Sequence, residues 1–354
     1  MNRCKKCVMP DTRPDHVFVD GICPACLVRE RLVNWDDREQ QLIELLDRHN
    51  GDVLVPSSGG KDSHYQVLKL LELGAHVTVV TASTCHLTEI GRLNIDNLSR
   101  HATTIEVTPR LEIRSKLNRL GLEWVGDVSW PEHAAIFSIP FRVAADTGIN
   151  LIMYGENPQN QYGGPKGTED AVLMTERWVQ EFGGFLGLRP SDFVGVEGIT
   201  ERDMEDYLPV WRPGIEAHFL GQYVKWDSGH NARAARGAGM VSKKPCTANW
   251  WAAENQDNAM TGVHDHFMYR KYAYGRGCTQ ISVDVRDGLT GRDEALRWVH
   301  QFDGLFPEEY AGVRCEDMLE RIELPWFKFL EIMDNFTNWE LFDGQKELRP
   351  IPKC

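Results

Sequence analysis

A seven-residue polar segment carries the strongest chemical signal in the sequence: Ser57-Ser58-Gly59-Gly60-Lys61-Asp62-Ser63, directly after the apolar run Val53-Leu54-Val55. Glycines let a backbone approach an anion and turn its N–H groups inward. A helix that begins here would add the positive end of its dipole. Lys61 supplies a compact positive charge, and Asp62 can hold Mg²⁺. The hydroxyl groups of Ser57 and Ser63 can donate to phosphate oxygens. The segment therefore predicts a phosphate-binding loop.

The glycine spacing separates this loop from a Walker loop, because both glycines stand directly before Lys61. The segment resembles the SGGKDS motif of the PP-loop ATP pyrophosphatases. That resemblance implies that ATP is split between its α and β phosphates and that AMP is transferred to a carbonyl-type oxygen. The structural alternative is a glycine-rich turn before a helix, without a ligand.

A second polar segment, Gly155-Glu156-Asn157, follows the apolar run 150–154. In an open parallel sheet, ligands bind beyond the carboxyl ends of the strands. Glu156 would therefore lie near the phosphate loop if the two preceding strands are neighbours. On local grounds, a turn with an exposed acid is an equal alternative.

Four cysteines form two C-x-x-C pairs, Cys4 with Cys7 and Cys23 with Cys26, and fifteen residues separate the pairs. This spacing is typical of a structural four-thiolate Zn²⁺ site, in which the ligands close a tetrahedron. An iron–sulfur cluster and unliganded thiols are the alternatives.

Apolar runs and helical periodicity alternate over the first half of the chain. Strands are predicted at 53–55, 77–80, 103–107 and 150–154, and helices at 31–50, from the phosphate loop to Gly74, and at 88–100, 110–120 and 131–147. This alternation predicts an α/β fold with a doubly wound parallel sheet. We expect a loop-dominated cysteine module at 1–30, an ATP-binding core at 31–160 and a mainly helical substrate region at 161–354. The polar stretch 155–168 is expected to act as a mobile lid.

The amino-acid composition argues against some classes of function. The 354 residues include 39 Lys and Arg against 52 Asp and Glu, a formal net charge of −13. That balance argues against sequence-independent nucleic-acid binding. No apolar run approaches the roughly 20 residues of a membrane span. The first residues also lack the apolar core of a signal peptide, so we expect a cytoplasmic location without membrane contact.

The cysteine pairs, the phosphate loop and Gly-Glu-Asn together resemble the N-acetyl sugar amidotransferase family, which makes bacterial surface polysaccharides such as lipopolysaccharide O-antigen. Blocks of the C-terminal half carry this narrower resemblance: 250–255, His264-Asp265, 271–277, 284–288 and Gly291-Arg292. One position departs from the family pattern, because Ala253 stands where an aromatic residue often precedes Glu254.

The resemblance implies that ATP adenylates the acetamido carbonyl of a sugar and that ammonia then displaces AMP, leaving an acetamidino sugar. The implied catalytic residues are Lys61, Asp62, Glu156, His264 and Arg276. ATP and Mg²⁺ would contact Ser57, Ser58, Gly59, Gly60, Lys61, Asp62, Ser63, Gly155 and Glu156. The substrate would contact Asn157, Tyr162, Gly163, Trp251 and Asp265.

Structural alternatives accompany several of these residues. His264 and Asp265 form either a functional pair or a hydrogen-bonded pair that fixes a turn. Arg276, between two glycines, is expected to be exposed and to contact an anion. Trp251 stacks on a ligand or packs in the core, which is the commoner fate of tryptophan.

The chain shows no glutaminase signature. Its second residue is Asn2, and no cysteine stands in a glycine-flanked elbow. We therefore expect a separate glutaminase subunit to supply ammonia. Two other functions remain open: a tRNA-thiolating PP-loop enzyme and a non-catalytic zinc-knuckle scaffold.

Overall fold

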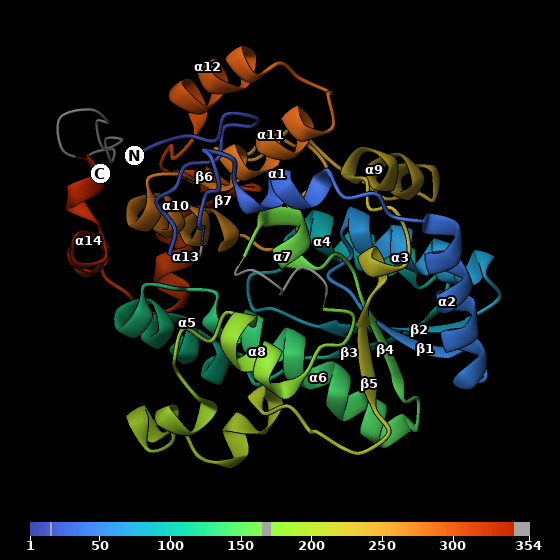
Figure 1. Ribbon diagram of the computed structural model, residues 1–354. Helices are drawn as coiled ribbons and strands as arrows, with labels where there is room; N and C mark the ends of the chain where they lie inside the picture. Colours follow the sequence, from blue (N-terminus) through green and yellow to red (C-terminus); the bar gives the residue numbers. More distant parts are fainter. Residues whose placement is uncertain (15, 165–170, 343–354) are drawn as a thin grey trace.

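A five-stranded parallel sheet organises the chain in the computed structural model, which describes residues 1–14, 16–164 and 171–342 (Figure 1). Its strands are β1 (Asp52–Pro56), β2 (His76–Ala82), β3 (Thr103–Val107), β4 (Leu151–Tyr154) and β5 (Glu216–Phe219). They lie in the order β3-β2-β1-β4-β5, and every neighbouring pair is parallel. The predicted fold class is confirmed.

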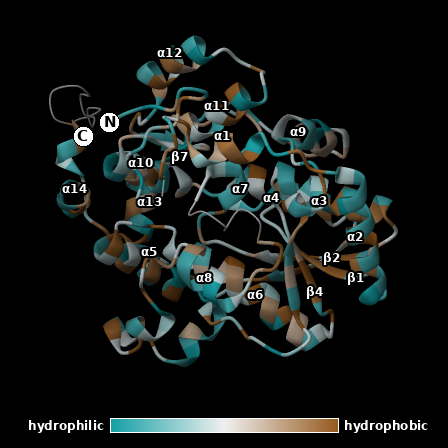
Figure 2. Cartoon of the chain, in the orientation of Figure 1, coloured by the Kyte–Doolittle hydropathy of each residue, from teal (hydrophilic) through white to brown (hydrophobic). Residues whose placement is uncertain are grey.

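Alternating side chains of each strand reach opposite faces of the sheet. Val53 and Val55 pack in a core with α2 and α3, whereas Leu54 packs in a second core with α5 and α6. Helices cover both faces, so the consecutive residues Val53, Leu54 and Val55 of β1 are all buried and apolar. Figure 2 shows this as brown along β1 and β2 and mixed colours on the surrounding helices.

The helices of the first half begin and end within a few residues of their predicted positions, apart from the later end of α5. They are α2 (Trp35–Arg48), α3 (Lys61–Glu72), α4 (Glu89–Leu98), α5 (Leu111–Val125) and α6 (Trp130–Thr147). A short helix, α1 (Pro24–Arg29), was not predicted in the cysteine module. Strand β5 was not predicted either, because Glu216 and His218 interrupt its apolar pattern and only four residues pair.

The predicted lid 155–168 contains an unpredicted helix, α7 (Pro158–Tyr162), which begins where the Asn157 side chain accepts a hydrogen bond from the backbone N–H of Gln159 at 3.0 Å. The part of the lid from residue 165 onward lies outside the described residues. Helix α8 (Glu176–Phe182) and short 3₁₀ segments at Pro190–Phe193 and Arg202–Tyr207 follow on the α6 side of the sheet.

The C-terminal region is mainly helical, as predicted. It contains α9 (Ser228–Gly237), α10 (Thr261–Tyr272), α11 (Arg276–Arg286), α12 (Arg292–Phe302), α13 (Cys315–Arg321) and α14 (Trp326–Asn335), with a small hairpin of β6 (Glu309–Tyr310) and β7 (Val313–Arg314). The N-terminal cysteine module lies against α11 and α12 (Figure 1) and shares an apolar core with Ile281 and Val299. Among the described helices, none is both long enough and apolar enough to cross a bilayer.

Candidate active site

The phosphate loop lies where the strand order reverses. From β1 the chain continues to β2 and β3 on one side of the sheet, and then returns to β4 on the other side. Strands β1 and β4 are neighbours, as Leu54 opposite Ile152 shows. The condition for bringing Glu156 to the phosphate loop is therefore met. Ligands of open α/β sheets bind at such a switch point, beyond the carboxyl ends of the strands.

Glycine at position 59 is required by the shape of the loop. Gly59 has φ +83°, a left-handed conformation that side chains disfavour. A Cβ atom there would lie 3.0 Å from the backbone nitrogen of Ile95 on α4. The backbone N–H of Gly59 donates a hydrogen bond to Ser57 Oγ at 3.0 Å, and the next residue, Gly60, is the N-cap of α3. The helix therefore presents its N-terminal end beyond β1, where an anion would be stabilised.

A cavity of about 400 Å³ opens beside this loop. Its walls include eight of the predicted site residues, Ser57, Ser58, Asp62, Ser63, Gly155, Glu156, His264 and Arg276. Three regions that are distant in sequence thus meet at one cavity: the loop after β1, the loop after β4 and the C-terminal helices. Its other walls include residues that were not predicted, among them Thr84, Glu132, His133, Asp257 and Asn258.

Lys61 lies behind the cavity wall rather than in it. The side chain is buried, pairs with Asp62, lies 3.7 Å from Glu254 Oε2 and sits 5.3 Å from the ring centroid of Trp251. Burial alone would lower the pKa of Lys61, but Asp62 and Glu254 outweigh it and raise this pKa. Lys61 is therefore a fixed cation that balances the acids of the cavity, and Glu254 is one of its two partners.

Acidic side chains gather around that cation. Burial, with the nearby charge of Asp62, raises the pKa of Glu156 to about 7. Burial also raises the pKa of Glu254, and raises that of Asp257 to about 6 although Ser58 donates a hydrogen bond to it. Buried like charges disfavour ionisation together. A divalent cation would relieve this repulsion, and Asp62, within the phosphate loop, suits a Mg²⁺ ion whose other ligands include phosphate oxygens.

The expected exposure of Arg276 is wrong, and the structural alternative for His264 and Asp265 does not hold. Arg276 is only a quarter exposed, because its Nε donates to Asp265 Oδ1 at 3.1 Å. Asp265 is also the main cause of the raised pKa of Arg276. His264 and Asp265 do not pair with each other in a turn. Both lie in α10, and His264 Nδ1 is instead 2.8 Å from Asp127 Oδ1.

The predicted substrate residues do not line this cavity. Trp251 packs over Lys61, and its Nε1 donates to Asp284 Oδ1 at 3.0 Å. Gly163 approaches His16 and the backbone of Ala25 in the cysteine module. The cavity walls include neither Gly163 nor Tyr162.

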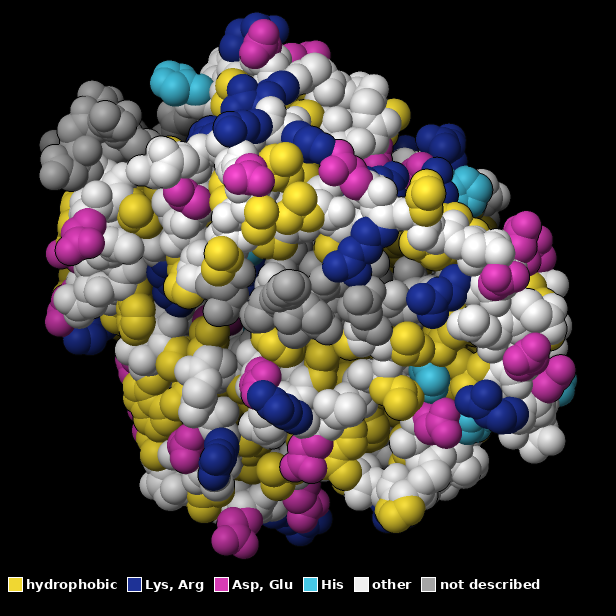
Figure 3. All heavy atoms as spheres, viewed as in Figure 1, with side chains coloured by type: hydrophobic (Ala, Val, Ile, Leu, Met, Phe, Trp, Pro, Cys, Tyr) yellow, Lys and Arg dark blue, Asp and Glu magenta, His cyan; other side chains and the backbone are white. Residues whose placement is uncertain are grey.

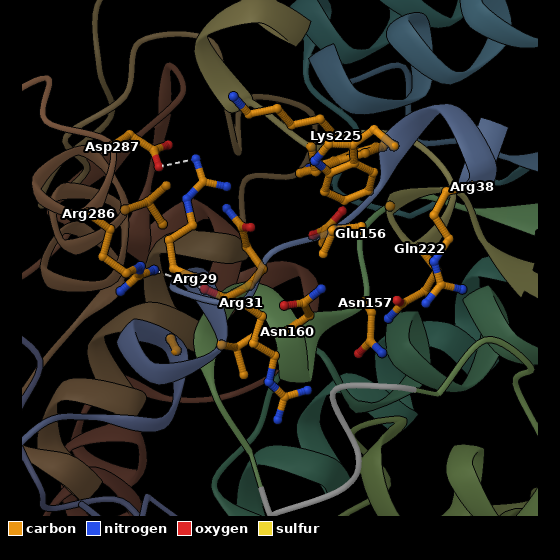
Figure 4. Close-up of a pocket in the computed structure, with 18 residues that line it drawn as sticks. Arg29, Arg31, Arg38, Glu156, Asn157, Asn160, Gln222, Lys225, Arg286 and Asp287 are labelled. Carbon is orange, nitrogen blue, oxygen red and sulfur yellow. Dashed lines mark hydrogen bonds and ion pairs between the residues drawn. The ribbon is translucent and has the colours of Figure 1, made fainter. Parts of the chain in front are cut away.

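A second pocket of about 320 Å³ shares Glu156 with the first. Asn157 lines it too, together with five cationic side chains from α1 to α11: Arg29, Arg31, Arg38, Lys225 and Arg286. Figure 4 shows these cations arranged around Glu156 and Asn157, with Arg29 paired to Asp287. Dark blue side chains gather on the same face of the molecule (Figure 3). The acidic chain thus carries a local basic pocket.

The four predicted cysteine ligands are all buried and lie together. Cys4 Sγ is 3.8 Å from Cys26 Sγ, and Cys7 Sγ is 3.6 Å from Cys23 Sγ. A tetrahedral Zn²⁺ with Zn–S bonds of about 2.3 Å separates its sulfurs by about 3.8 Å. All four sulfur atoms lie within 4.8 Å of one another, and a polynuclear iron–sulfur cluster would hold them further apart. The cluster therefore fits one tetrahedral metal ion.

The comparisons with known proteins concern the C-terminal region and the fold. Among solved structures, NMN synthetase from Francisella tularensis is 13% identical, with a TM-score of 0.29, and the match covers 60% of this chain and 99% of that one. No curated protein matched the chain. Residues 245–352 match the model of a family described as LPS biosynthesis protein WbpG-like, C-terminal domain. The part of the chain that supplies Asp257, His264 and Arg276 to the cavity is therefore similar to the C-terminal domain of a lipopolysaccharide-biosynthesis family.

Proposed function

We propose that this chain is an ATP-dependent amidotransferase that converts the acetamido group of a sugar into an acetamidino group, releasing AMP and pyrophosphate. One observation carries the proposal. The phosphate loop and the WbpG-like region line the same cavity of about 400 Å³. A loop expected to bind ATP and a region similar to a lipopolysaccharide-biosynthesis family thus line one cavity.

The chemistry needs an activated oxygen, because an amide oxygen is a poor leaving group. Transfer of AMP from ATP to the acetamido carbonyl turns that oxygen into part of a phosphate ester. The N-terminal end of α3 and Arg276 would stabilise the phosphate charge as it shifts. Mg²⁺ held by Asp62 would neutralise phosphate oxygens and orient the α phosphorus. Glu156, with its pKa raised to about 7, suits proton exchange near neutral pH.

Ammonia must come from outside this chain in the proposed reaction. Among the described residues, no cysteine lines either cavity, so the structure offers no thiol there to hydrolyse glutamine. We propose that a separate glutaminase subunit supplies ammonia. The purified chain should use high ammonium but not glutamine, and adding the glutaminase should restore glutamine use. Turnover of glutamine by the chain alone would contradict this.

The reaction is tested with the full-length protein, ATP, Mg²⁺, ammonium chloride and a panel of acetamido sugars, free and nucleotide-linked. Mass spectrometry should find a product in which NH replaces O, formed in step with pyrophosphate. Asp206→Asn is the matched control, because Asp206 pairs with Arg142 and lines neither cavity. Pyrophosphate release without the mass change would reject the amidotransferase assignment.

The basic pocket favours one competing function, tRNA thiolation, because Arg29, Arg31 and Arg38 present positive charge beside Glu156. Such an enzyme would bind tRNA, with an affinity that falls steeply as salt increases. A gel-shift titration at physiological salt separates the two functions. The acidic net charge of −13 leads us to expect no tRNA complex.

A further inference from the structure

A buried carboxylate lies between two imidazoles that line the same cavity as the phosphate loop. Asp127 Oδ1 is 2.8 Å from His264 Nδ1, and Asp127 Oδ2 is 3.4 Å from His133 Nδ1. Both histidines line the cavity. Nothing in the sequence or the family comparison assigns Asp127 or His133 to a site, and His264 was predicted without its partner.

The surrounding elements hold the carboxylate in place. Asp127 is 4% exposed, and its Oδ1 accepts the backbone N–H of Ser129 at 2.8 Å. His133 and His264 are each the fourth residue of a helix, α6 and α10 respectively, so the carboxylate lies near two helix N-termini. Two positive dipole ends and two imidazoles favour the ionised carboxylate. Accordingly, the pKa of Asp127 is well below its usual value: burial opposes ionisation, but His264 outweighs it.

The hydrogen bond selects one tautomer of His264. An ionised carboxylate only accepts hydrogen bonds, so the proton of the neutral imidazole must be on Nδ1. Nε2 then carries a lone pair. Among the described residues, no hydrogen bond to Nε2 of His264 is found, and this histidine is 21% exposed along the cavity. An imidazole oriented by a buried carboxylate, with its other nitrogen free, is the arrangement of a general base.

Other charges face this group as well. His264 is also near Asp265 and Arg276, and Lys271 faces Asp127. Burial disfavours the charged imidazole, but Asp127 outweighs it and raises the pKa of His264. The proton that His264 accepts is thus stabilised by the carboxylate behind it. His133, at 3.4 Å from Asp127 and with its Nδ1 buried without a hydrogen bond, is held less firmly.

We propose that His264 is the base that deprotonates the attacking nitrogen, and that Asp127 is the positioning residue that fixes its tautomer. This rests on the proposed function. Ammonia adds to the carbon of the adenylated acetamido group, forming a C–N bond and placing a positive charge on nitrogen. His264 Nε2 removes one proton from that nitrogen. The nitrogen lone pair then expels AMP as the C–O bond breaks, and the product is the amidinium ion. His264 finally returns its proton to solvent.

The first experiment separates the two halves of the reaction in Asp127→Asn. Sugar-dependent exchange of pyrophosphate into ATP should be unchanged, because adenylation depends on the phosphate loop. Amidine formation from ammonia should fall by about 10²- to 10⁴-fold, the usual contribution of a general base. With hydroxylamine in place of ammonia, the rate of product formation should fall far less. After attack, the nitrogen of hydroxylamine is more acidic than that of ammonia and needs less help from a base. Asp206→Asn, which changes an aspartate outside both cavities, should match wild type in all three assays.

The competing explanations give different results. If Asp127→Asn slows exchange and both nucleophiles equally, Asp127 is structural and the proposal is wrong. Asp127, His133 and His264 also lie close enough together to hold a metal. A second metal ion per chain that Asp127→Asn removes would likewise overturn the proposal. If wild type makes no amidine from any sugar, the proposed function fails, and the tautomer is then tested alone.

That second experiment needs no reaction. Side-chain ¹⁵N NMR of the histidines, with His264→Gln to identify the signals, reports which nitrogen carries the proton at a pH where the imidazole is neutral. We expect the proton on Nδ1 in the wild type and a shift towards Nε2 in Asp127→Asn, because an asparagine amide can donate to Nδ1. A wild-type proton on Nε2 would overturn the proposal whatever the substrate.

Discussion

Replacing Gly59 by alanine tests whether the phosphate loop binds ATP. The size of the expected effect follows from the geometry of the loop at this position. A left-handed residue other than glycine costs about 1–2 kcal/mol. Gly59 has φ +83°, and an added Cβ would also lie 3.0 Å from the nitrogen and 3.1 Å from Cγ1 of Ile95. The loop or α4 must therefore shift by some tenths of an ångström. Misplacement of this kind can cost on the order of 10- to 100-fold in rate.

Gly74 provides a matched control at the other end of α3. Its φ of +81° imposes the same backbone cost, but an added Cβ would meet nothing within 4 Å. Urea denaturation should show a loss of about 1–2 kcal/mol from the backbone cost in both variants. Only Gly59→Ala should also lose ATP binding and sugar-dependent pyrophosphate release. If Gly59→Ala releases pyrophosphate as fast as Gly74→Ala, the loop does not hold the phosphates of ATP.

Three further predictions follow from the same structure. Asp62→Asn should abolish pyrophosphate release without changing the far-ultraviolet circular dichroism, because an amide is a poor Mg²⁺ ligand; activity equal to that of Asp206→Asn would contradict this. Elemental analysis should find one zinc per wild-type chain and little in Cys26→Ser, which should also unfold at lower temperature; bound iron with visible absorbance would be the contrary result. The folded pKa of His264 is raised above its unfolded value of 6.5, so its ion pair stabilises the fold fully below pH 6.5 and loses that effect as pH rises through the folded pKa. The difference in Tm between wild type and His264→Gln should therefore be larger at pH 6 than at pH 9, and an equal or reversed difference would refute the assignment.

Local sequence patterns were sufficient to predict the features that are formed by a single stretch of the chain. The phosphate loop is contiguous, and each cysteine pair closes within one turn, so residue types and spacing alone indicate both. Strands β1 and β4 are buried on both faces, and their apolar runs are therefore unbroken, whereas β3, at the edge of the sheet, has only partly buried and exposed residues.

Features built from distant segments could not be predicted in this way. Asp127 and His264 are 137 positions apart in the sequence, and no local motif around either residue indicates that the two are partners. Arg276 looked exposed because glycines flank it, but Asp265 on the neighbouring helix binds it. Strand β5 was missed for a related reason. Its polar residues have local partners, since His218 contacts both Glu216 and Tyr223, and this allows a strand without a continuous apolar pattern.

The most direct test of the proposed reaction follows its three products in the same incubation. The full-length protein is incubated with ATP, Mg²⁺, ammonium chloride enriched in ¹⁵N, and the acetamido sugars of the panel. For one sugar, we expect a product that contains one ¹⁵N in place of the acetamido oxygen, and one AMP and one pyrophosphate for each such molecule. Formation of AMP and pyrophosphate with no ¹⁵N in any sugar would contradict the account.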